Sequence, residues 1–466
     1  MYVQTFNFGK VPIEMWEYPV MFALLALVYL IGQRIRKKNI KAYPEFRYFI
    51  PGLFIKVGGG FFFACIYVFY YGQGDTTSFY ECSMAFTRLL LHDVGDFMTV
   101  LFGNGTQEMK SYFTSQTGEP LMYMFAESST RFTTKILVPF VLISGQSYFI
   151  TTFFVSIFTY GGLWGLYRMF VSYYPSYNRE LAYAVLFMPS VAFWGSGILK
   201  DSFTLAATTY LIVRINAVIK HKGSLWLNVV AIIVFSYIII SIKAYVMLII
   251  LPSALVWLMY SRISKITNSL IKYLVLPLVV LFIVVGSYFG LRAFGESLGK
   301  FSVEHALKTA AINQNDLKQE YYEGNSFDIG DFEPTVAGAL SKSPQATAAG
   351  LFRPFLWESR NIVMLLSALE NSIILGFTLW ILIKIKWRRI TKYLGKHPLI
   401  IYCLVFSIMF AFMIGLTSPN FGALVRFKVP LIPLYMASLM ILYLELKPGK
   451  NWEKTNQARY RQPWTN

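Results

Sequence analysis

Several uninterrupted apolar stretches of about 18 residues or more constrain this chain more than any other feature of its sequence. A helix rises about 1.5 Å per residue, so roughly 20 such residues are needed to cross the hydrocarbon layer of a bilayer. The composition agrees, because 56% of the 466 residues are hydrophobic and only 14% are charged. Outer-membrane barrels are excluded, since their strands are short and alternate in polarity. We therefore expect an all-α, polytopic transmembrane helical bundle.

The hydropathy pattern predicts eleven spans, with two larger segments outside the membrane at 72–136 and 292–361. Neither segment is long enough for a soluble nucleotide-binding domain of about 100 to 150 residues. Any chemistry must therefore be built from helix ends and loops. The predicted spans have the approximate limits 15–32, 49–71, 137–166, 181–197, 202–219, 225–242, 244–261, 273–291, 362–385, 398–416 and 429–446.

The distribution of charge predicts the orientation of these spans. Lys and Arg gather in every second loop, notably in 33–48 and 384–396, and such loops are typically cytoplasmic. The N-terminus is then outside and the C-terminus inside. Most of the 24 Asp and Glu residues fall on the outer face, so we expect carboxylate chemistry there. The net charge of +18 is thus explained by topology and does not indicate a nucleic-acid partner.

Cysteine, histidine and glycine patterns exclude several kinds of site. Cys65 and Cys403 fall within predicted spans, which leaves Cys82 without a partner for an external disulfide. The four His residues have no spacing typical of a zinc site. The run 58–60 of three glycines lacks the Lys-Ser/Thr of a phosphate loop and lies within a predicted span, where glycine serves close helix packing.

The first outer segment places a carboxylate directly after a span. Gly72 and Gly74 let the chain turn at the membrane surface and hold Asp75 there. Asp75 is therefore a candidate catalytic base, and the alternative is a cap for a helix that begins near Thr77.

Further along the same segment, Arg88, His92 and Asp96 recur every four residues opposite apolar side chains of 86–101. This spacing predicts one amphipathic helix lying flat on the bilayer, with Arg88 and His92 as candidate substrate-binding residues. The alternative is a solvated face of an ordinary interfacial helix.

Two short turns complete the outer face. After the predicted span 181–197, Lys200 and Asp201 are candidate site residues, although Asp201 could also cap the helix that follows. Between the last two spans, Arg426 and Lys428 stand on the outer face, where topology does not require positive charge. They would suit a phosphate or diphosphate, and the alternative is contact with lipid headgroups. Lys243, at the end of the predicted span 225–242, would add to this cationic surface.

Three further residues are candidates near the second outer segment. Arg353 and Glu358 flank interfacial aromatic residues where the chain returns to the membrane, either as a functional pair or as a structural ion pair. Glu370 lies within the predicted span 362–385, and an intramembrane carboxylate is a functional candidate by default. Its alternative role is a buried hydrogen bond to a neighbouring helix.

This layout resembles the GT-C class of integral-membrane glycosyltransferases. The resemblance rests on the external Asp75 after a span, the amphipathic helix that follows, and the large external loop after the eighth span, and it covers roughly residues 49–361. It implies an enzyme that takes sugars from polyprenyl-phosphate carriers, with Asp75 as catalytic acid residue of the first loop and, less directly, Asp201 and the Arg353/Glu358 pair. One base together with a phosphate leaving group predicts a single displacement with inversion. Gly-Asp-Thr stands where a paired acidic motif is often found, so the use of a divalent metal stays open and no other cofactor is implied.

Other phrases, from Pro189 to Asp201 and from Asn420 to Pro430, are similar to those of membrane proteins encoded with bacterial surface-polysaccharide functions. These resemblances imply a multi-pass protein of the bacterial inner membrane, with a lipid-linked sugar or glycan as substrate, membrane lipid around it and partners in a polysaccharide-assembly complex. The implied organisation is an anchor span with a basic loop (1–48), a GT-C-like module (49–361), three C-terminal spans (362–446) and a basic tail (447–466). A polysaccharide polymerase or ligase, a lipid-linked-glycan flippase and a structural subunit of an envelope complex are the alternatives.

Overall fold

The structure is a computed structural model that describes residues 5–8, 11–103, 105, 107–263, 308, 311–312 and 325–447. Within these residues the regular structure is almost entirely helical. A short antiparallel hairpin of β1 (Thr5–Phe8) and β2 (Val11–Glu14) supplies the two named strands of that part. The expected all-α class is therefore confirmed. The chain divides into two compact units, Met1–Met247 and Leu248–Asn466.

Among the residues that the structure describes, seven helices are long and apolar enough to cross a membrane, and there are eight candidates if one bent pair counts as a span. This finding agrees with a multi-pass membrane protein, although it does not reproduce the eleven expected spans. The predicted span 273–291 lies outside the described residues. The seven are Glu17–Asn39, Pro44–Tyr70, Tyr148–Tyr173, Lys200–Ile219, Leu225–Met259, Ile362–Lys384 and Pro398–Thr417.

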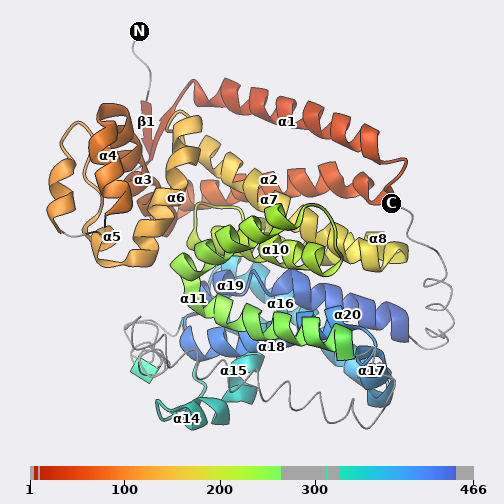
Figure 1. Cartoon of the computed structure of the whole chain (residues 1–466). Coiled ribbons are helices and arrows are strands. Elements are labelled where there is room, and N and C mark those ends of the chain that lie inside the picture. The colour runs from red at the N-terminus through yellow and green to blue at the C-terminus, as the bar shows by residue number, and fades with distance from the viewer. Residues whose placement is uncertain are drawn as a thin grey trace. The chain divides into compact units, whose positions relative to one another are not determined.

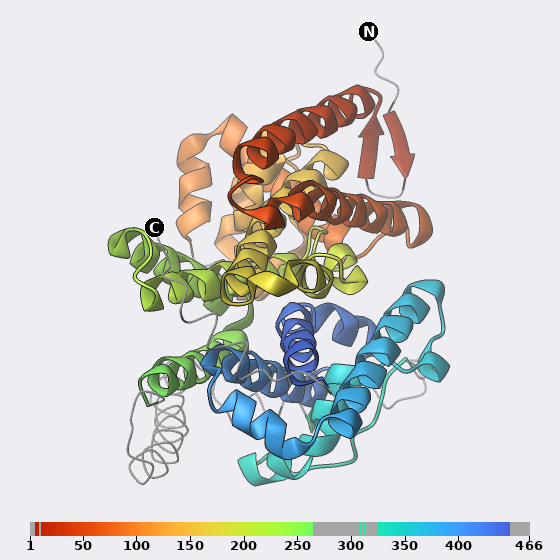
Figure 2. The same cartoon turned by 90° about the vertical axis from the view of Figure 1, so that its right-hand side faces the viewer.

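The first unit contains most of the described helices (Figure 1). The hairpin and α1 lie along its edge in both views, and α1 leaves most of its apolar surface exposed (Figure 2). The helices of this unit are α1 (Glu17–Asn39), η1 (Pro44–Tyr48), α2 (Phe49–Cys65), the π-helical turn η2 (Ile66–Tyr70), α3 (Asp75–His92), α4 (Val94–Phe102), η3 (Gln107–Tyr112), α5 (Met122–Ala126), α6 (Ser128–Ile143), α7 (Tyr148–Tyr173), η4 (Pro175–Tyr177), α8 (Asn178–Val185), α9 (Pro189–Phe193), α10 (Lys200–Ile219) and the start of α11 (Leu225–Ile263).

Two glycines allow α2 to pack closely against its neighbours. A Cβ atom on Gly59 would lie 2.2 Å from the carbonyl oxygen of Ala192, and one on Gly60 would lie 2.2 Å from the hydroxyl of Ser156. A Cβ on Gly58 would meet nothing within 4 Å. The expected role in helix packing therefore belongs to the second and third glycines of the run.

The helices α3, α4, α5 and α6 form a subdomain of their own, grouped at one end of α2 and α7 (Figure 1). Its core contains residues from each of these helices, including Phe86, Phe97, Met124 and Val138. We call it the α3–α6 subdomain, and it takes in most of the segment 72–136 that was expected outside the membrane.

The prediction of a single amphipathic helix over 86–101 is wrong, because two separate helices are found there. The helix α3 ends at His92, and Asp93 starts α4 by accepting a hydrogen bond from the backbone N–H of Asp96 (2.8 Å). Asp at the N-cap competes well against continuation of a helix, because its side chain satisfies a free N–H. Asp96 thus belongs to a different helix from Arg88 and His92.

Two predicted spans are interrupted in the first unit. The stretch 137–166 is broken at 144–147, where Gly145 and Gln146 adopt φ values of 64° and 63° and Ser147 caps α7. The stretch 181–197 consists of the short helices α8 and α9 followed by an irregular run to Leu199. Pro189 has no backbone N–H with which to continue α8. The continuous helix that the apolar character of this stretch predicts is therefore not formed.

The interrupted stretch 186–199 follows α2 along its length. Phe187 contacts Tyr48 at the start of α2, and Phe193 contacts Phe63 near its end, with ring centroids 6.2 and 5.4 Å apart. Between them, the buried Lys56 Nζ donates to the carbonyl oxygens of Val191 (2.7 Å) and Gly195 (2.6 Å). Lys56 therefore satisfies carbonyl groups that the broken helix leaves open, which apolar surroundings would otherwise penalise.

The predicted spans 225–242 and 244–261 appear as the single helix α11, which is interrupted at Lys243 (φ −145°, ψ 79°). The helix is interrupted at the residue that separates the two predicted spans. By length and composition, however, α11 counts as one candidate span.

The second unit contains the remaining described elements. The predicted span 429–446 corresponds to α20, which begins three residues later and ends at the predicted limit. The short helix α19 precedes it at an angle of 65°, with Pro430 in the break between them. The helices of this unit are the continuation of α11, α14 (Val336–Ser341), α15 (Ser343–Phe352), η7 (Leu356–Glu358), α16 (Ile362–Lys384), α17 (Trp387–Leu394), α18 (Pro398–Thr417), α19 (Phe421–Phe427) and α20 (Ile432–Leu446).

Candidate functional site

Asp201 and Lys243 form a buried ion pair in the first unit. Asp201 lies in the first turn of α10, and Lys243 is the residue that interrupts α11. The Lys243 Nζ donates to Asp201 Oδ1 at 2.5 Å, and the two side chains are only 9% and 5% exposed. An unpaired charge at such a buried site is strongly destabilising, so each of the two residues supplies the counter-charge that the other needs. The pair thus ties the beginning of α10 to the break in α11.

Lys200, the residue before Asp201, points to the α3–α6 subdomain. Its Nζ lies 2.7 Å from Glu127 Oε1 and 2.9 Å from Ser129 Oγ, and 5.6 Å from the ring centroid of Phe79. Partial burial alone would raise the pKa of Glu127, but hydrogen bonds from Lys200, Ser129 and Thr130 lower it to about 2. Glu127 is therefore ionised throughout the neutral range.

Asp75 is the first residue of α3 and is exposed. The capping of this helix falls to Thr77, whose hydroxyl donates to the carbonyl of Gly74 (2.9 Å) and accepts from its N–H (3.1 Å). Asp75 is thus not needed as the N-cap. It lies four residues before Phe79, so both side chains share one face of α3.

These residues converge from four elements of one unit. Lys200 of α10 pairs with Glu127 at the start of α6 and lies over the ring of Phe79 in α3, and Asp201 beside it pairs with Lys243 at the break in α11. Asp75 is grouped with them because it lies one helical turn before Phe79. We call this set the unit-1 charge cluster, and it consists of Asp75, Glu127, Lys200, Asp201 and Lys243.

Arg88 and His92 lie outside this cluster. Arg88 is 13 residues after Asp75, which is about 20 Å along a helix. Its Nε donates to Gln146 Oε1 at 3.1 Å, so it contacts the turn between α6 and α7. His92 is the exposed last residue of α3.

The remaining candidates belong to the second unit. Arg353 Nε lies 3.5 Å from Glu358 Oε1, and its guanidinium group lies over the rings of Phe327 (5.2 Å) and Phe355 (5.7 Å). Glu358 also accepts a hydrogen bond from the backbone N–H of Phe355 (2.7 Å). The expected pair of Arg353 and Glu358 therefore exists, as part of a folded turn.

Lys428 does not have the expected outward position. Its side chain is 1% exposed, and its Nζ donates to Asn371 Oδ1 (2.6 Å) and to the carbonyl oxygens of Arg353 (2.8 Å) and Leu351 (3.4 Å). An ammonium group has three N–H donors, so these acceptors use all of them. The sequence predicts a cation on the protein surface, whereas the structure places Lys428 in the interior. Lys428 therefore cannot bind a phosphate in this conformation, because it is buried and its three N–H groups already have acceptors.

Glu370 lies close to Lys428 in space, and Arg426 lies two residues before it in the sequence. Glu370 is 7% exposed and interacts electrostatically with Lys428. Arg426 lies half-buried in the last turn of α19. Glu370 thus has the buried polar environment that its alternative role required.

Two residues of these clusters were missed by sequence reasoning. Glu127 precedes Ser-Ser-Thr, a pattern typical of a helix start, and it could have been found by that signal. Asn371, next to Glu370, gave no signal beyond its position in a predicted span. Within the described ranges, no three His, Cys, Asp or Glu side chains are arranged to hold a metal ion.

Comparisons of this chain with protein-family profiles, curated proteins and solved structures gave no match.

Proposed function

We propose that this chain is a membrane glycosyltransferase of the bacterial inner membrane, which transfers sugar from a polyprenyl-phosphate carrier on the extracytoplasmic face. The observation that carries the proposal is the unit-1 charge cluster, in which an exposed carboxylate begins the α3–α6 subdomain and a partly exposed lysine begins the apolar helix α10. A lipid-linked donor needs this combination, because its chain stays in the bilayer while its phosphate requires cations at the surface.

The roles within the cluster follow from exposure and pairing. Asp75 is exposed, so it is the base that takes the proton from the acceptor hydroxyl as this oxygen attacks the anomeric carbon. Lys200 has an exposed neighbour in Glu127, which a phosphate can replace, so Lys200 stabilises the charge that develops on the departing phosphate. One base and one departing phosphate imply a single displacement with inversion.

Asp201 and Lys243 have a positioning role in this proposal. Both are buried and bonded to one another, so neither reaches substrate in this conformation. Their ion pair fixes the first turn of α10 and thereby the backbone from which Lys200 extends. Asp201 is therefore assigned as a positioning residue, in place of the catalytic role expected from the sequence.

The orientation belongs to the same proposal, with the N-terminus outside, the C-terminus in the cytoplasm and the α3–α6 subdomain outside. A cysteine placed at the exposed Glu119 should then react with a membrane-impermeant maleimide in intact cells, whereas one at Lys392 should react only after lysis. The reverse result would move the cluster to the cytoplasmic face and contradict the proposal.

The direct test is transfer from purified donors. Protein in proteoliposomes is mixed with a panel of polyprenyl-phosphate monosaccharides that carry labelled sugars, and with envelope glycolipids as acceptors. Label that appears in an acceptor, together with release of polyprenyl phosphate, supports a transferase. Release of long glycans from polyprenyl diphosphate would favour a polymerase or ligase, and movement of labelled lipid across the bilayer without any transfer would favour a flippase. Either outcome would replace the proposed activity.

A further inference from the structure

The helix α17 connects two candidate membrane-spanning helices, α16 and α18 (Figure 1). It therefore lies between the end of α16 at Lys384 and the beginning of α18 at Pro398. One face of α17 is attached to the protein, because Ile390 and Tyr393 are buried and lie one turn apart. The ring of Tyr393 stacks on that of His397, directly before α18, with centroids 3.9 Å apart. The opposite face of α17 is left exposed.

The exposed face combines cations with a large aromatic ring. Trp387 is 66% exposed, and the exposed side chains of Lys386 and Arg388 stand on either side of it in the sequence. The apolar Ile383 is 78% exposed and is followed at once by the exposed Lys384. Trp is typical of the headgroup level of a bilayer, and Lys or Arg close to a span is typical of contact with anionic headgroups. The boundary of the hydrocarbon layer is therefore expected at this end of α16.

The end of α20 lies beside the end of α16 and adds a further cation. The rings of Trp380 in α16 and Tyr443 in α20 have centroids 4.7 Å apart. Lys384 and Lys447, both exposed, each follow one of these rings by four residues, which is about one helical turn. Two helix ends thus bring exposed lysines to a similar level. We call the following set the α17 surface: Lys384, Lys386, Trp387, Arg388 and Lys447.

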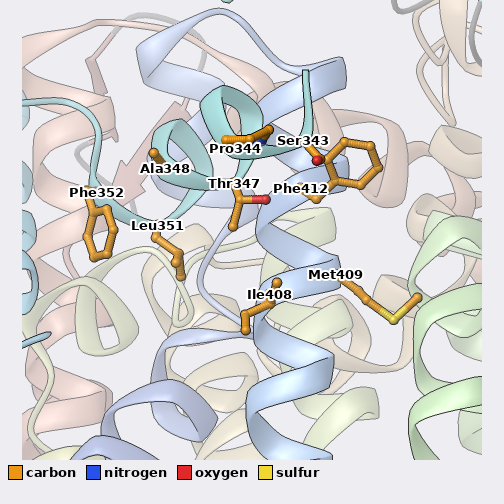
Figure 3. Close-up of a pocket in the computed structure, with 9 residues that line it drawn as sticks. All are labelled: Ser343, Pro344, Thr347, Ala348, Leu351, Phe352, Ile408, Met409 and Phe412. Carbon is orange, nitrogen blue, oxygen red and sulfur yellow. The ribbon is translucent and has the colours of Figure 1, made fainter. Parts of the chain in front are cut away.

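The surroundings of the α17 surface sharpen its positive character. Glu445 is the single acidic residue in the sequence from 371 to 447, and its side chain is fully buried. Farther along α18, a groove of about 500 Å³ against α15 is lined by uncharged and mostly apolar side chains, such as Leu351, Ile408 and Phe412 (Figure 3). An apolar surface of this kind suits hydrocarbon, whereas the exposed cations gather where α18 begins.

We propose that the α17 surface binds the headgroup of an anionic phospholipid, of the phosphatidylglycerol or cardiolipin kind, from the leaflet in which α16 ends. Its cations complement the phosphate of such a lipid, and the exposed Trp387 and Ile383 fit the boundary between headgroups and acyl chains. A soluble acidic partner would complement the cations alone. The general preference of cytoplasmic loops for Lys and Arg is met by an unfolded loop, so it does not explain a folded helix that presents an exposed Trp among them. This site is independent of the proposed sugar transfer.

The proposal is tested by native mass spectrometry of the full-length protein in detergent with equal amounts of phosphatidylcholine, phosphatidylglycerol and cardiolipin. We expect the protein to retain an anionic lipid at least about ten-fold more than phosphatidylcholine, because several cations act on its headgroup together. Combined Lys384→Gln, Lys386→Gln and Arg388→Gln should reduce this preference to less than about two-fold. All three side chains are exposed, so the variant should keep the unfolding midpoint of wild type. Lys384→Arg, Lys386→Arg and Arg388→Lys, which conserve the charge, should keep the preference.

The control removes the same charge from another basic helix end. Combined Arg34→Gln, Lys37→Gln and Lys38→Gln changes three exposed residues at the end of α1, where no Trp accompanies the cations, and should leave the preference unchanged. An equal loss in both triple variants would assign the preference to net charge and overturn the α17 surface as a site. Equal retention of phosphatidylcholine and anionic lipids by wild type would overturn it as well.

A soluble acidic partner is tested with a poly-glutamate peptide, added to the protein in nanodiscs of phosphatidylcholine. We expect the triple variant at 384, 386 and 388 to bind this peptide as weakly as wild type does. Tight binding by wild type that this variant loses, in a protein without preference for anionic lipid, would assign the surface to an acidic protein segment and overturn the lipid proposal.

Discussion

The ion pair between Asp201 and Lys243 joins the first turn of one helix to the only non-helical residue within another, at an Nζ–Oδ1 distance of 2.5 Å. Its two residues are 42 positions apart, and the sequence indicates them for different reasons, one as a helix-start carboxylate and one as a lysine at the end of a span. The structure shows that each compensates the other. The pair therefore explains how a lysine and an aspartate can remain buried among apolar helices.

The first prediction concerns this pair. Lys243→Met should lower the free energy of unfolding by about 3–5 kcal/mol, because it leaves the carboxylate of Asp201 buried without a counter-charge. The double variant Asp201→Leu with Lys243→Met should be more stable than the Lys243→Met single variant, since no isolated charge remains. Lys222→Met, at an exposed lysine, is the control and should change stability by less than about 0.5 kcal/mol. Unfolding of the detergent-solubilised variants by heat, followed by tryptophan fluorescence, measures the differences. Equal effects at positions 243 and 222 would contradict the buried pair.

The second prediction concerns the run of three glycines in α2. Gly59→Ala should destabilise by about 1–3 kcal/mol, because its Cβ would lie 2.2 Å from the backbone oxygen of Ala192. Gly58→Ala should be neutral or stabilising by up to about 1 kcal/mol, because its Cβ meets nothing within 4 Å and alanine favours a helix. The two variants have the same chemistry and adjacent positions. A comparison of their thermal unfolding midpoints therefore isolates the contact between α2 and α9, and equal midpoints would refute it.

The third prediction concerns pH. The pKa of Glu127 is lowered to about 2 in the folded protein, against about 4.3 for an unperturbed glutamate. Its contribution to stability is therefore present above about pH 4.3 and is lost as the pH falls toward 2. Glu127→Gln should remove this contribution, so wild type and variant should differ at pH 6 and converge below pH 3. The difference should be at most about 1 kcal/mol, because Glu127 is 54% exposed and its attraction to Lys200 is screened by water. A difference that does not change with pH would show that Glu127 stabilises the fold by other contacts.

The fourth prediction separates the two cations near the end of α19. Lys428→Met should destabilise by about 3–5 kcal/mol, because it leaves Asn371, two carbonyl groups and the nearby Glu370 without their buried partner. Arg426→Ala, at a half-buried residue, should have a smaller effect on unfolding. Thermal unfolding of both variants provides the comparison. A Lys428→Met protein that unfolds like wild type would return Lys428 to the phosphate-binding role expected from the sequence.

The sequence was informative about long apolar helices and about which residue types stand at their ends. Helices α1, α10, α16 and α18 begin or end within a few residues of the predicted limits, because their apolar runs are long and carry no internal break. The stretch 181–197 was not predicted correctly, because its apolar residues also suit short helices buried against α2. Hydropathy reports burial from water and does not distinguish burial in lipid from burial in protein.

The candidate site was predicted in part for a related reason. The sequence indicates both Asp201 and Lys243 as site residues, but their contact depends on how α10 and α11 pack, which no local pattern encodes. The sequence predicts Lys428 as a surface cation, because nothing in the residues around it shows that α15 ends beside it. Charged residues at helix ends are thus visible in a sequence, whereas their partners are set by tertiary packing.

The fifth prediction is that Asp75→Asn abolishes most sugar transfer while the protein stays folded and inserted. In the proposed reaction Asp75 takes the proton of the acceptor hydroxyl, and loss of such general-base assistance typically costs about 10² to 10⁴ in rate. The competing view, in which Asp75 stabilises the start of α3, predicts almost no effect, because Thr77 and Gly74 close the first turn and Asn suits a helix start about as well as Asp does. Asp96→Asn is the matched control, since Asp96 occupies the first turn of α4 in the same subdomain and has no role in the reaction. Initial rates of transfer from the labelled donor, together with expression level and unfolding midpoint, are measured for both variants. Normal transfer by a stable Asp75→Asn protein would remove this carboxylate from the mechanism and leave the proposed activity without its base.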